Sequence, residues 1–211
     1  MRINERLNIV IPLYHDDEPY AYVHSTPISR EVFEVNYLLI SKTFSSIHSE
    51  GLGEVAGPRV AQLIMRDIAE QGGDRTQKSA RSLLDEIGRL SNVILAGKSG
   101  WETIPLQEAL DRKLIDEDDR SEVMNSLVFF TVASLMYPRN MRQMFMDRAA
   151  QIWGARMLSS NSTDFTASLP TSTATVSSGE AAAPRSVPPA AGATLIVTDQ
   201  TGARVISSLP V

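Results

Sequence analysis

The chain contains no cysteine, which excludes disulfide bonds, thiolate metal sites and a cysteine nucleophile. It is also short of positive charge, since 20 Lys and Arg stand against 25 Asp and Glu and no basic run occurs. A surface that binds nucleic acid needs clustered Lys and Arg to contact phosphates. With a formal net charge of −5, the sequence therefore predicts no nucleic-acid partner.

Long apolar runs are absent as well. The most apolar stretch, Leu127–Tyr137, contains Thr131 and Ser134 and is far shorter than the ~20 residues that cross a bilayer. Residues 1–10 lack the apolar core of a signal peptide. We therefore expect a cytoplasmic protein that has no contact with a membrane.

What the sequence does contain is the pattern of a mainly α-helical bundle preceded by a small β-hairpin. Strand-like residues at 7–14 and 20–25 flank the turn-forming HDDEP, and Pro12 keeps the first strand weak or at a sheet edge. Residues 121–137 are apolar nearly all round, which predicts the central buried helix. Apolar periodicity and capping residues predict helices over 27–50, 58–71, 77–95, from Pro105 within 101–115, 116–137 and 140–158.

The composition changes after residue 159. We predict a helical body over residues 1–159 with its hairpin at 7–25, a low-complexity linker over 160–193, and an extended C-terminal arm over 194–211. The linker is mostly Ser, Thr, Ala, Pro and Gly, which bury too little apolar surface to offset the entropy of ordering the backbone. In the arm, TLIV and RVIS flank TDQTGA and predict a second short β-hairpin. An isolated two-stranded hairpin is marginal in water, so this one needs a strand from a partner.

Three motifs offer chemistry, and each has a simpler structural explanation. AGKSG, residues 96–100, is similar to the end of a phosphate-binding loop motif, but that motif requires a glycine where Asn92 stands, and a loop that ends a helix explains the segment. DEDD, residues 116–119, offers paired carboxylates, although a helix dipole also favours acidic residues at a helix start. His15–Glu18 with His24 nearby offers metal ligands, although hairpin turns are commonly polar. We therefore predict no catalytic residue, no metal, no cofactor and no enzymatic activity.

Methionine is concentrated near the end of the predicted body. Six of the eight methionines fall within residues 124–157, and the last predicted helix also carries Phe145 and Trp153. Methionine is flexible and polarizable, so these side chains either fill the core or adapt to an apolar partner. Met136 and Met146 fall off the main apolar stripe and are the better surface candidates. The candidate partner-binding residues are Met136, Met141, Met144, Phe145, Met146, Trp153, Leu195, Val197, Val205 and Ile206.

Three stretches are typical of one protein family: VHSTPISREVFEVNYLLISKTFSSIHSEGLGEVAGPRVAQLIMRDIAE, GWETIPLQEALDRKLIDEDD and SEVMNSLVFFTVASLMYPRNMR. With the polar continuation STDFTASLPTSTATVSSGE, they make residues 2–167 resemble tail assembly chaperones of long-tailed bacteriophages. These are the G-type proteins made just upstream of the tape-measure protein. The stretches are typical of the family, and none of them is a catalytic signature.

The resemblance implies a mostly helical chaperone in the host cytoplasm that coats the long apolar helices of the tape-measure protein. In such families a programmed ribosomal frameshift often adds a C-terminal extension, which recruits the tail-tube protein. A tethered hairpin fits this role, because a tether raises the local concentration of what its end binds. The hairpin, 194–209, would bind by adding a strand to a sheet edge, and the body would bind through its methionine-rich last helix.

Two other functions stay open. The chain could be a structural virion component, such as a head–tail connector or another tail or neck protein, whose C-terminal arm packs on neighbouring subunits. An ATP-using assembly factor is a third hypothesis, and it depends on AGKSG alone. The sequence leaves open whether the chain forms a homo-oligomer.

Overall fold

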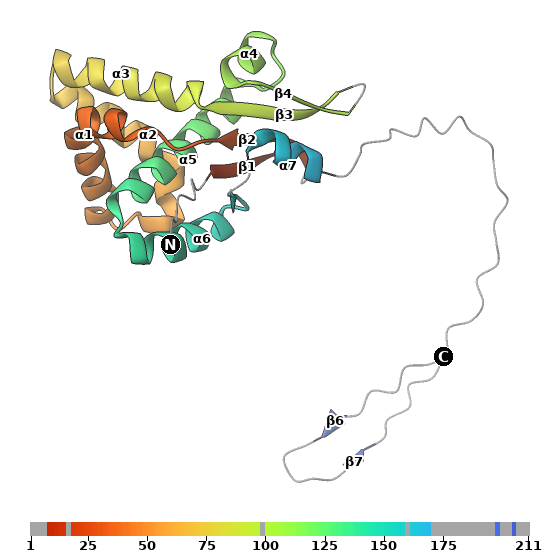
Figure 1. Cartoon of the computed structure of the whole chain (residues 1–211). Helices are drawn as coiled ribbons and strands as arrows, with labels where there is room; N and C mark the ends of the chain where they lie inside the picture. Colours follow the sequence, from red (N-terminus) through yellow and green to blue (C-terminus); the bar gives the residue numbers. More distant parts are fainter. Residues whose placement is uncertain are drawn as a thin grey trace. The chain divides into compact units, whose positions relative to one another are not determined.

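The structure is a computed structural model that describes residues 8–15, 18–97, 100–158, 161–169, 197–198 and 204–205. The chain divides into two units, Met1–Thr173 and Ala174–Val211, which are described separately. In the first unit, helices pack against one antiparallel sheet (Figure 1). The mainly helical character predicted from the sequence is confirmed for the described residues, but the sheet is larger than a single hairpin.

The sheet of the first unit has five strands in the order β4-β3-β2-β1-β5, and all neighbours are antiparallel. Its strands are β1 (Asn8–His15), β2 (Glu18–Ser25), β3 (Ser91–Gly97), β4 (Gly100–Pro105) and β5 (Arg156–Leu158). The hairpin predicted over residues 7–25 is confirmed as β1 and β2. It forms the middle of the sheet together with β3.

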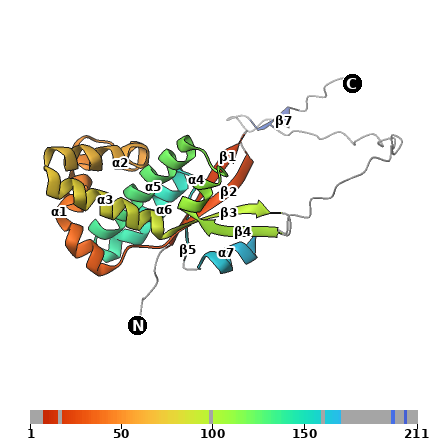
Figure 2. The same ribbon diagram turned by 90° about the horizontal axis from the view of Figure 1, so that it is seen from above.

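The helices of the first unit lie mostly at one end of this unit. They are α1 (Arg30–Ser49), α2 (Gly53–Gln71), α3 (Asp74–Arg89), α4 (Leu106–Asp111), α5 (Glu117–Met136), α6 (Arg139–Ile152) and α7 (Ser162–Ser168). Figure 2 shows α1, α2 and α3 side by side, with β1 to β4 extending away from them. The predicted short helix from Pro105 is α4.

Helix α5 is the buried centre of the unit, as predicted. Every residue from Val123 to Phe130 is buried. The DEDD segment caps the helix, because Asp116 Oδ1 accepts a hydrogen bond from the Asp119 N–H at 2.8 Å. Tyr20 on β2 donates its hydroxyl to Asp119; burial raises the pKa of this phenol, and the hydrogen bond raises it further. Asp116 and Asp119 therefore cap the start of α5, and Asp119 also accepts a hydrogen bond from the sheet.

Helix α2 begins at Gly53, five residues before the predicted start at Pro58. Proline has no N–H, so Glu54 O lacks the donor that the next helical turn would supply. Trp153 fills this place and donates its indole N–H to Glu54 O at 2.8 Å. One turn further on, Asn125 Oδ1 accepts from the Gln62 N–H at 3.0 Å. Trp153 at the end of α6 and Asn125 of α5 thus each form a hydrogen bond with the backbone of α2.

The helix predicted over residues 77–95 is wrong beyond Arg89. Helix α3 ends there with Leu90 as its C-cap, and the next residues form β3. Val93 and Ile94 are β-branched and lie between β2 and β4, where both are buried. Apolar spacing alone does not separate a helical continuation from a short buried strand.

The last predicted helix ends at Ile152 and not at residue 158. Gly154, at φ +63°, takes the left-handed conformation that commonly follows a helix end. The chain then forms β5, which pairs with the first residues of β1. Strand β1 lies between β2 and β5 and is therefore not an edge strand, but among the described residues Pro12 lies beyond the part that pairs with β5.

The sheet has an apolar cluster on each face. On one face, side chains such as Ile11 and Val23 join the core beneath the helices. On the other face, Val10 and Ile94 pack against Phe165 of α7, which is only 4% exposed. Helix α7 therefore closes the second face of the sheet.

Helix α7 lies within the segment predicted to be a low-complexity linker, 160–193. Its N-cap is Asn161, whose Oδ1 accepts from the Asp164 N–H at 2.9 Å. Thr166 contacts Thr103 of β4 through their hydroxyl oxygens at 3.2 Å. The first unit thus continues past the boundary predicted at residue 159.

The second unit contains one described pair of strands. Strand β6 (Val197–Thr198) pairs antiparallel with β7 (Arg204–Val205), within the hairpin predicted for the C-terminal arm. Val197 lies opposite Val205 in the register. The rest of the predicted arm, which includes Leu195 and Ile206, lies outside the described residues, and so does most of the predicted linker.

Candidate partner-binding surface

Helix α6 exposes a row of large apolar side chains. Met141 is 44% exposed, Met144 is 66% exposed and Ile152 is 49% exposed. Their spacings of three and eight residues place them on one side of the helix. We call these three residues the α6 strip. The buried side of the same helix consists of Phe145, Met146, Ala149 and Ala150.

An aromatic cluster fixes the first half of α6. The Phe145 ring stacks on Tyr137 with 3.9 Å between the ring centroids. The Tyr137 hydroxyl lies 2.9 Å from His48 Nε2, which joins the end of α5 to α1. Burial raises the pKa of the Tyr137 phenol, and the negative charge of Glu54 raises it further. The α6 strip is therefore presented by a helix whose position is set by packing.

The predicted candidate residues of the last helix divide between surface and core. Met141 and Met144 are exposed, while Phe145 is buried. The expectation that Met146 lies at the surface is wrong, because it is 1% exposed. Met136 is half-buried and packs against the core. Met146 falls off the predicted apolar stripe, but α6 turns that flank toward the core, whereas Met136 is the last residue of α5.

The other predicted candidates lie elsewhere. Trp153 is half-buried, and its indole N–H donates a hydrogen bond to the backbone of α2. Val197 lies opposite Val205 in the register of the β6–β7 pair. Leu195 and Ile206 lie outside the described residues. Among the predicted residues whose exposure is described, the structure brings together Met141 and Met144 as an exposed surface, and it adds Ile152.

Replacing Trp153 by phenylalanine is expected to lower the free energy of unfolding by about 1 kcal/mol, because the ring still packs but the bond to Glu54 O is lost. Urea denaturation measures this change. In a Pro58→Ala background the helix regains an N–H for that carbonyl, so the same Trp153 substitution should cost less. Equal costs in both backgrounds would show that the indole bond contributes nothing.

The phosphate-loop hypothesis does not match the backbone around residues 96–100. Strands β3 and β4 pair antiparallel up to Gly97 and Gly100, while residues 98 and 99 lie outside the described part. A phosphate-binding loop instead leads from a strand into a helix N-terminus, whose N–H groups hold the phosphates. The described residues on either side of 98 and 99 therefore form two paired strands, which is not the strand-to-helix geometry on which the ATP-using hypothesis depends.

The two histidines near the first hairpin are not brought together. His15 lies opposite Glu18, whereas His24 lies opposite Val10 at the other end of the hairpin. His24 is 1% exposed, with its ring 6.5 Å from that of Phe165. Within the described ranges, no group of three His, Asp or Glu side chains could hold a metal ion.

No helix of the described chain is long and apolar enough to cross a membrane.

A groove of about 760 Å³ between α2, α3, α4 and α5 was not indicated by the sequence. Leu84 and Leu106 contribute apolar surface to it, and four arginines contribute guanidinium groups: Arg66, Arg81, Arg89 and Arg120. These arginines come from three different helices, so no local motif could reveal them. Glu70 and Asp85 line the same groove, so it carries charges of both signs.

Comparison of the chain with family models, with curated proteins and with solved structures gives no match. Function is therefore inferred from two sources. One is the geometry of the described residues, above all the α6 strip. The other is the resemblance of the stretches quoted above to phage tail assembly chaperones.

Proposed function

We propose that this chain is a bacteriophage tail assembly chaperone, a protein without enzymatic activity that binds the tape-measure protein and helps to recruit tail-tube subunits. The resemblance over residues 2–167 supports the class. The single observation that carries the binding role is the exposure of Met141 and Met144 on α6. The chain acts in the host cytoplasm, before the tail is complete.

The α6 strip has properties that suit a long apolar partner helix. Methionine side chains are unbranched and polarizable, so one surface can fit different apolar shapes along the partner. A partner helix laid against the strip buries its apolar face as in other helix-binding surfaces. The stacking of Phe145 on Tyr137 holds α6 in place, so little conformational entropy is lost on binding.

The C-terminal arm supports the second role. The pair of strands β6 and β7 offers backbone groups that can extend a sheet of the tail-tube protein by strand addition. The sequence between residues 170 and 196 is rich in Ser, Ala and Pro, a composition typical of a tether. A tether keeps the bound tail-tube subunit at high local concentration near the tape-measure protein.

The α6 strip is tested with the double substitution Met141→Gln and Met144→Gln. The chain is co-expressed with the large helical protein encoded downstream, and the dissociation constant of the purified complex is measured. The double variant should bind at least tenfold more weakly, because two apolar contacts are lost. Leu63→Gln is the matched control, since Leu63 is 57% exposed on α2 and lies outside the strip.

Two outcomes contradict the proposal. Unchanged binding of the double variant, with a loss in the Leu63→Gln control, places the partner surface on α2. Absence of a complex, together with a fixed copy number of the chain in purified virions, supports the alternative function. In that case the chain is a structural component, a head–tail connector or another tail or neck protein, whose arm packs on neighbouring subunits.

A further inference from the structure

Helix α1 carries the two most exposed large apolar side chains of the described chain. Val35 is 82% exposed and Leu38 is 71% exposed. They are neighbours on the helix surface, since they are three residues apart. A pair of apolar side chains so fully in water is a mark of a surface that a partner covers.

Val35 and Leu38 belong to a regular row on α1. Glu31, Val35, Leu38 and Lys42 follow one another at spacings of four, three and four residues, and all four are exposed. This alternation of four and three is the repeat that keeps side chains along one seam between paired helices. We call these four residues the α1 seam.

The α1 seam is complementary to itself. Val35 and Leu38 lie equally far on either side of one midpoint of the helix, and so do Glu31 and Lys42. Two α1 helices placed antiparallel about a two-fold axis at that midpoint set Val35 of each copy against Leu38 of the other. The same axis sets Glu31 of each copy against Lys42 of the other, so two apolar layers lie between two pairs of opposite charge.

The charged ends of the α1 seam are available for such pairs. Neither Glu31 nor Lys42 forms an ion pair with another residue of the described ranges. On the same helix, by contrast, Arg30 and Glu34 pair with each other at 2.7 Å. The seam therefore combines exposed apolar surface with unused charges in a two-fold arrangement.

We propose that α1 is a self-association surface and that its occupant is a second copy of this chain, docked antiparallel along the α1 seam. A hollow of about 670 Å³ between α1 and α3 borders the seam, and Glu31 and Val35 help to line it. With only two apolar layers, the contact is at the small end of specific interfaces, so the dimer is weak and dissociates on dilution.

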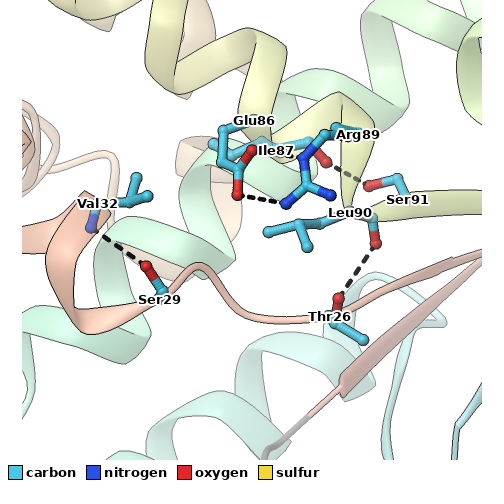
Figure 3. Close-up of polar contacts among 8 residues, drawn as sticks. All are labelled: Thr26, Ser29, Val32, Glu86, Ile87, Arg89, Leu90 and Ser91. Atoms are coloured by element: carbon cyan, nitrogen blue, oxygen red, sulfur yellow. Dashed lines mark hydrogen bonds and ion pairs between the residues drawn. The ribbon is translucent and has the colours of Figure 1, made fainter.

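Figure 3 shows the polar contacts at the ends of the two helices that border the hollow. Thr26 Oγ1, just before α1, donates to Leu90 O at the end of α3 at 3.4 Å. Ser29 caps α1 by accepting from the Val32 N–H at 3.3 Å. Arg89 and Glu86, which line the hollow, pair at 2.7 Å. One of these hydrogen bonds joins the start of α1 to the end of α3, and the other two contacts are local to one helix each.

Charge reversal tests the antiparallel register. In a dimer of the Glu31→Lys variant, two lysines lie opposite each other at both ends of the seam and repel. In a dimer of the Lys42→Glu variant, two glutamates lie opposite each other at both ends and repel. Each variant should dimerise about tenfold more weakly than the wild type in sedimentation equilibrium. An equimolar mixture of the two variants should regain the lost affinity, because both charge pairs of the mixed dimer are attractive again. Glu122→Lys, at an exposed position of α5, is the control for net charge.

Cross-linking tests the apolar layers, and the absence of native cysteine makes it direct. Chains with Val35→Cys and tagged chains with Leu38→Cys are mixed at high concentration and oxidised. The mixed disulfide should form at least fivefold faster than the disulfide between two identical chains, because only the mixed pair lies in one layer. Leu63→Cys chains, with the thiol on α2, should cross-link at the background rate.

The outcomes separate this proposal from the tape-measure proposal, on which it does not depend. A wild type that stays monomeric at high concentration overturns the α1 proposal, even when the α6 strip binds its partner. Faster cross-linking between identical Val35→Cys chains overturns the antiparallel register. Circular dichroism of every variant checks that α1 is still folded.

Discussion

Replacing Gly57 by alanine is expected to lower the free energy of unfolding by about 2 kcal/mol. A Cβ atom on Gly57 would lie 2.6 Å from Cε2 of Phe129 and 3.1 Å from Cγ2 of Ile47. Phe129 is 1% exposed and sits in a filled core, so it has no free space to move into. The new methyl group therefore forces α2 and α5 apart. Urea denaturation followed by circular dichroism measures the loss.

Gly88 of α3 is the matched control for this substitution. No atom lies within 4 Å of a Cβ built on Gly88, so alanine meets no obstacle there. Because alanine has the higher helix propensity, Gly88→Ala should raise the free energy of unfolding by roughly 0.5–1 kcal/mol. The two glycine-to-alanine substitutions should therefore change the free energy of unfolding in opposite directions. If both stabilise the protein, the contact between Gly57 and Phe129 is looser than described.

Elements specified by local signals could be predicted from the sequence. Helix α5 has an acidic cap at Asp116 and an apolar surface nearly all round, and both signals lie within the helix itself. Strand β3 depends on distant residues, because Val93 pairs with Val23 on one side and Ile104 on the other. Its apolar residues continue the spacing of α3, so the sequence shows a longer helix. Pairing between distant segments is the information that periodicity lacks.

The candidate surface was predicted only in part for a similar reason. Periodicity finds the apolar side of α6, but it does not show how much of that side the core covers. The core covers Phe145 and Met146 and leaves Met144 exposed. The arginines of the groove, such as Arg66 and Arg120, come together only after the helices pack. Self-complementarity of the α1 seam is visible in the sequence, but its exposure is not.

Helix α7 shows how composition can hide an element of the fold. Residues 160–193 are dominated by small and polar residues, which predicts a linker. One aromatic residue, Phe165, is enough to anchor a short helix, because the sheet offers it an apolar site made by Val10 and Ile94. Tyr22 and Trp101 pack against the same cluster. The stability of α7 therefore comes from the sheet and not from its own sequence.

Replacing Phe165 by alanine is expected to lower the free energy of unfolding by about 3 kcal/mol, since a buried aromatic ring is removed and leaves a cavity against Val10 and Ile94. Thr163→Ala on the exposed side of α7 is the matched control and should change stability by less than about 0.5 kcal/mol. A chain that ends at residue 158 should lose at least as much stability as Phe165→Ala. A chain that ends at residue 173 should keep nearly all of it.

The two truncated chains also separate stability from partner binding. The chain that ends at residue 173 keeps α7 and the α6 strip, so under the proposed function it still binds the tape-measure protein but no longer recruits tail-tube subunits. If the chain that ends at residue 158 is as stable as the full chain, α7 adds nothing to the first unit. The second face of the sheet, with Val10 and Tyr22, would then be open to a partner. Measuring both chains by urea denaturation therefore decides whether this face belongs to the core or to an interface.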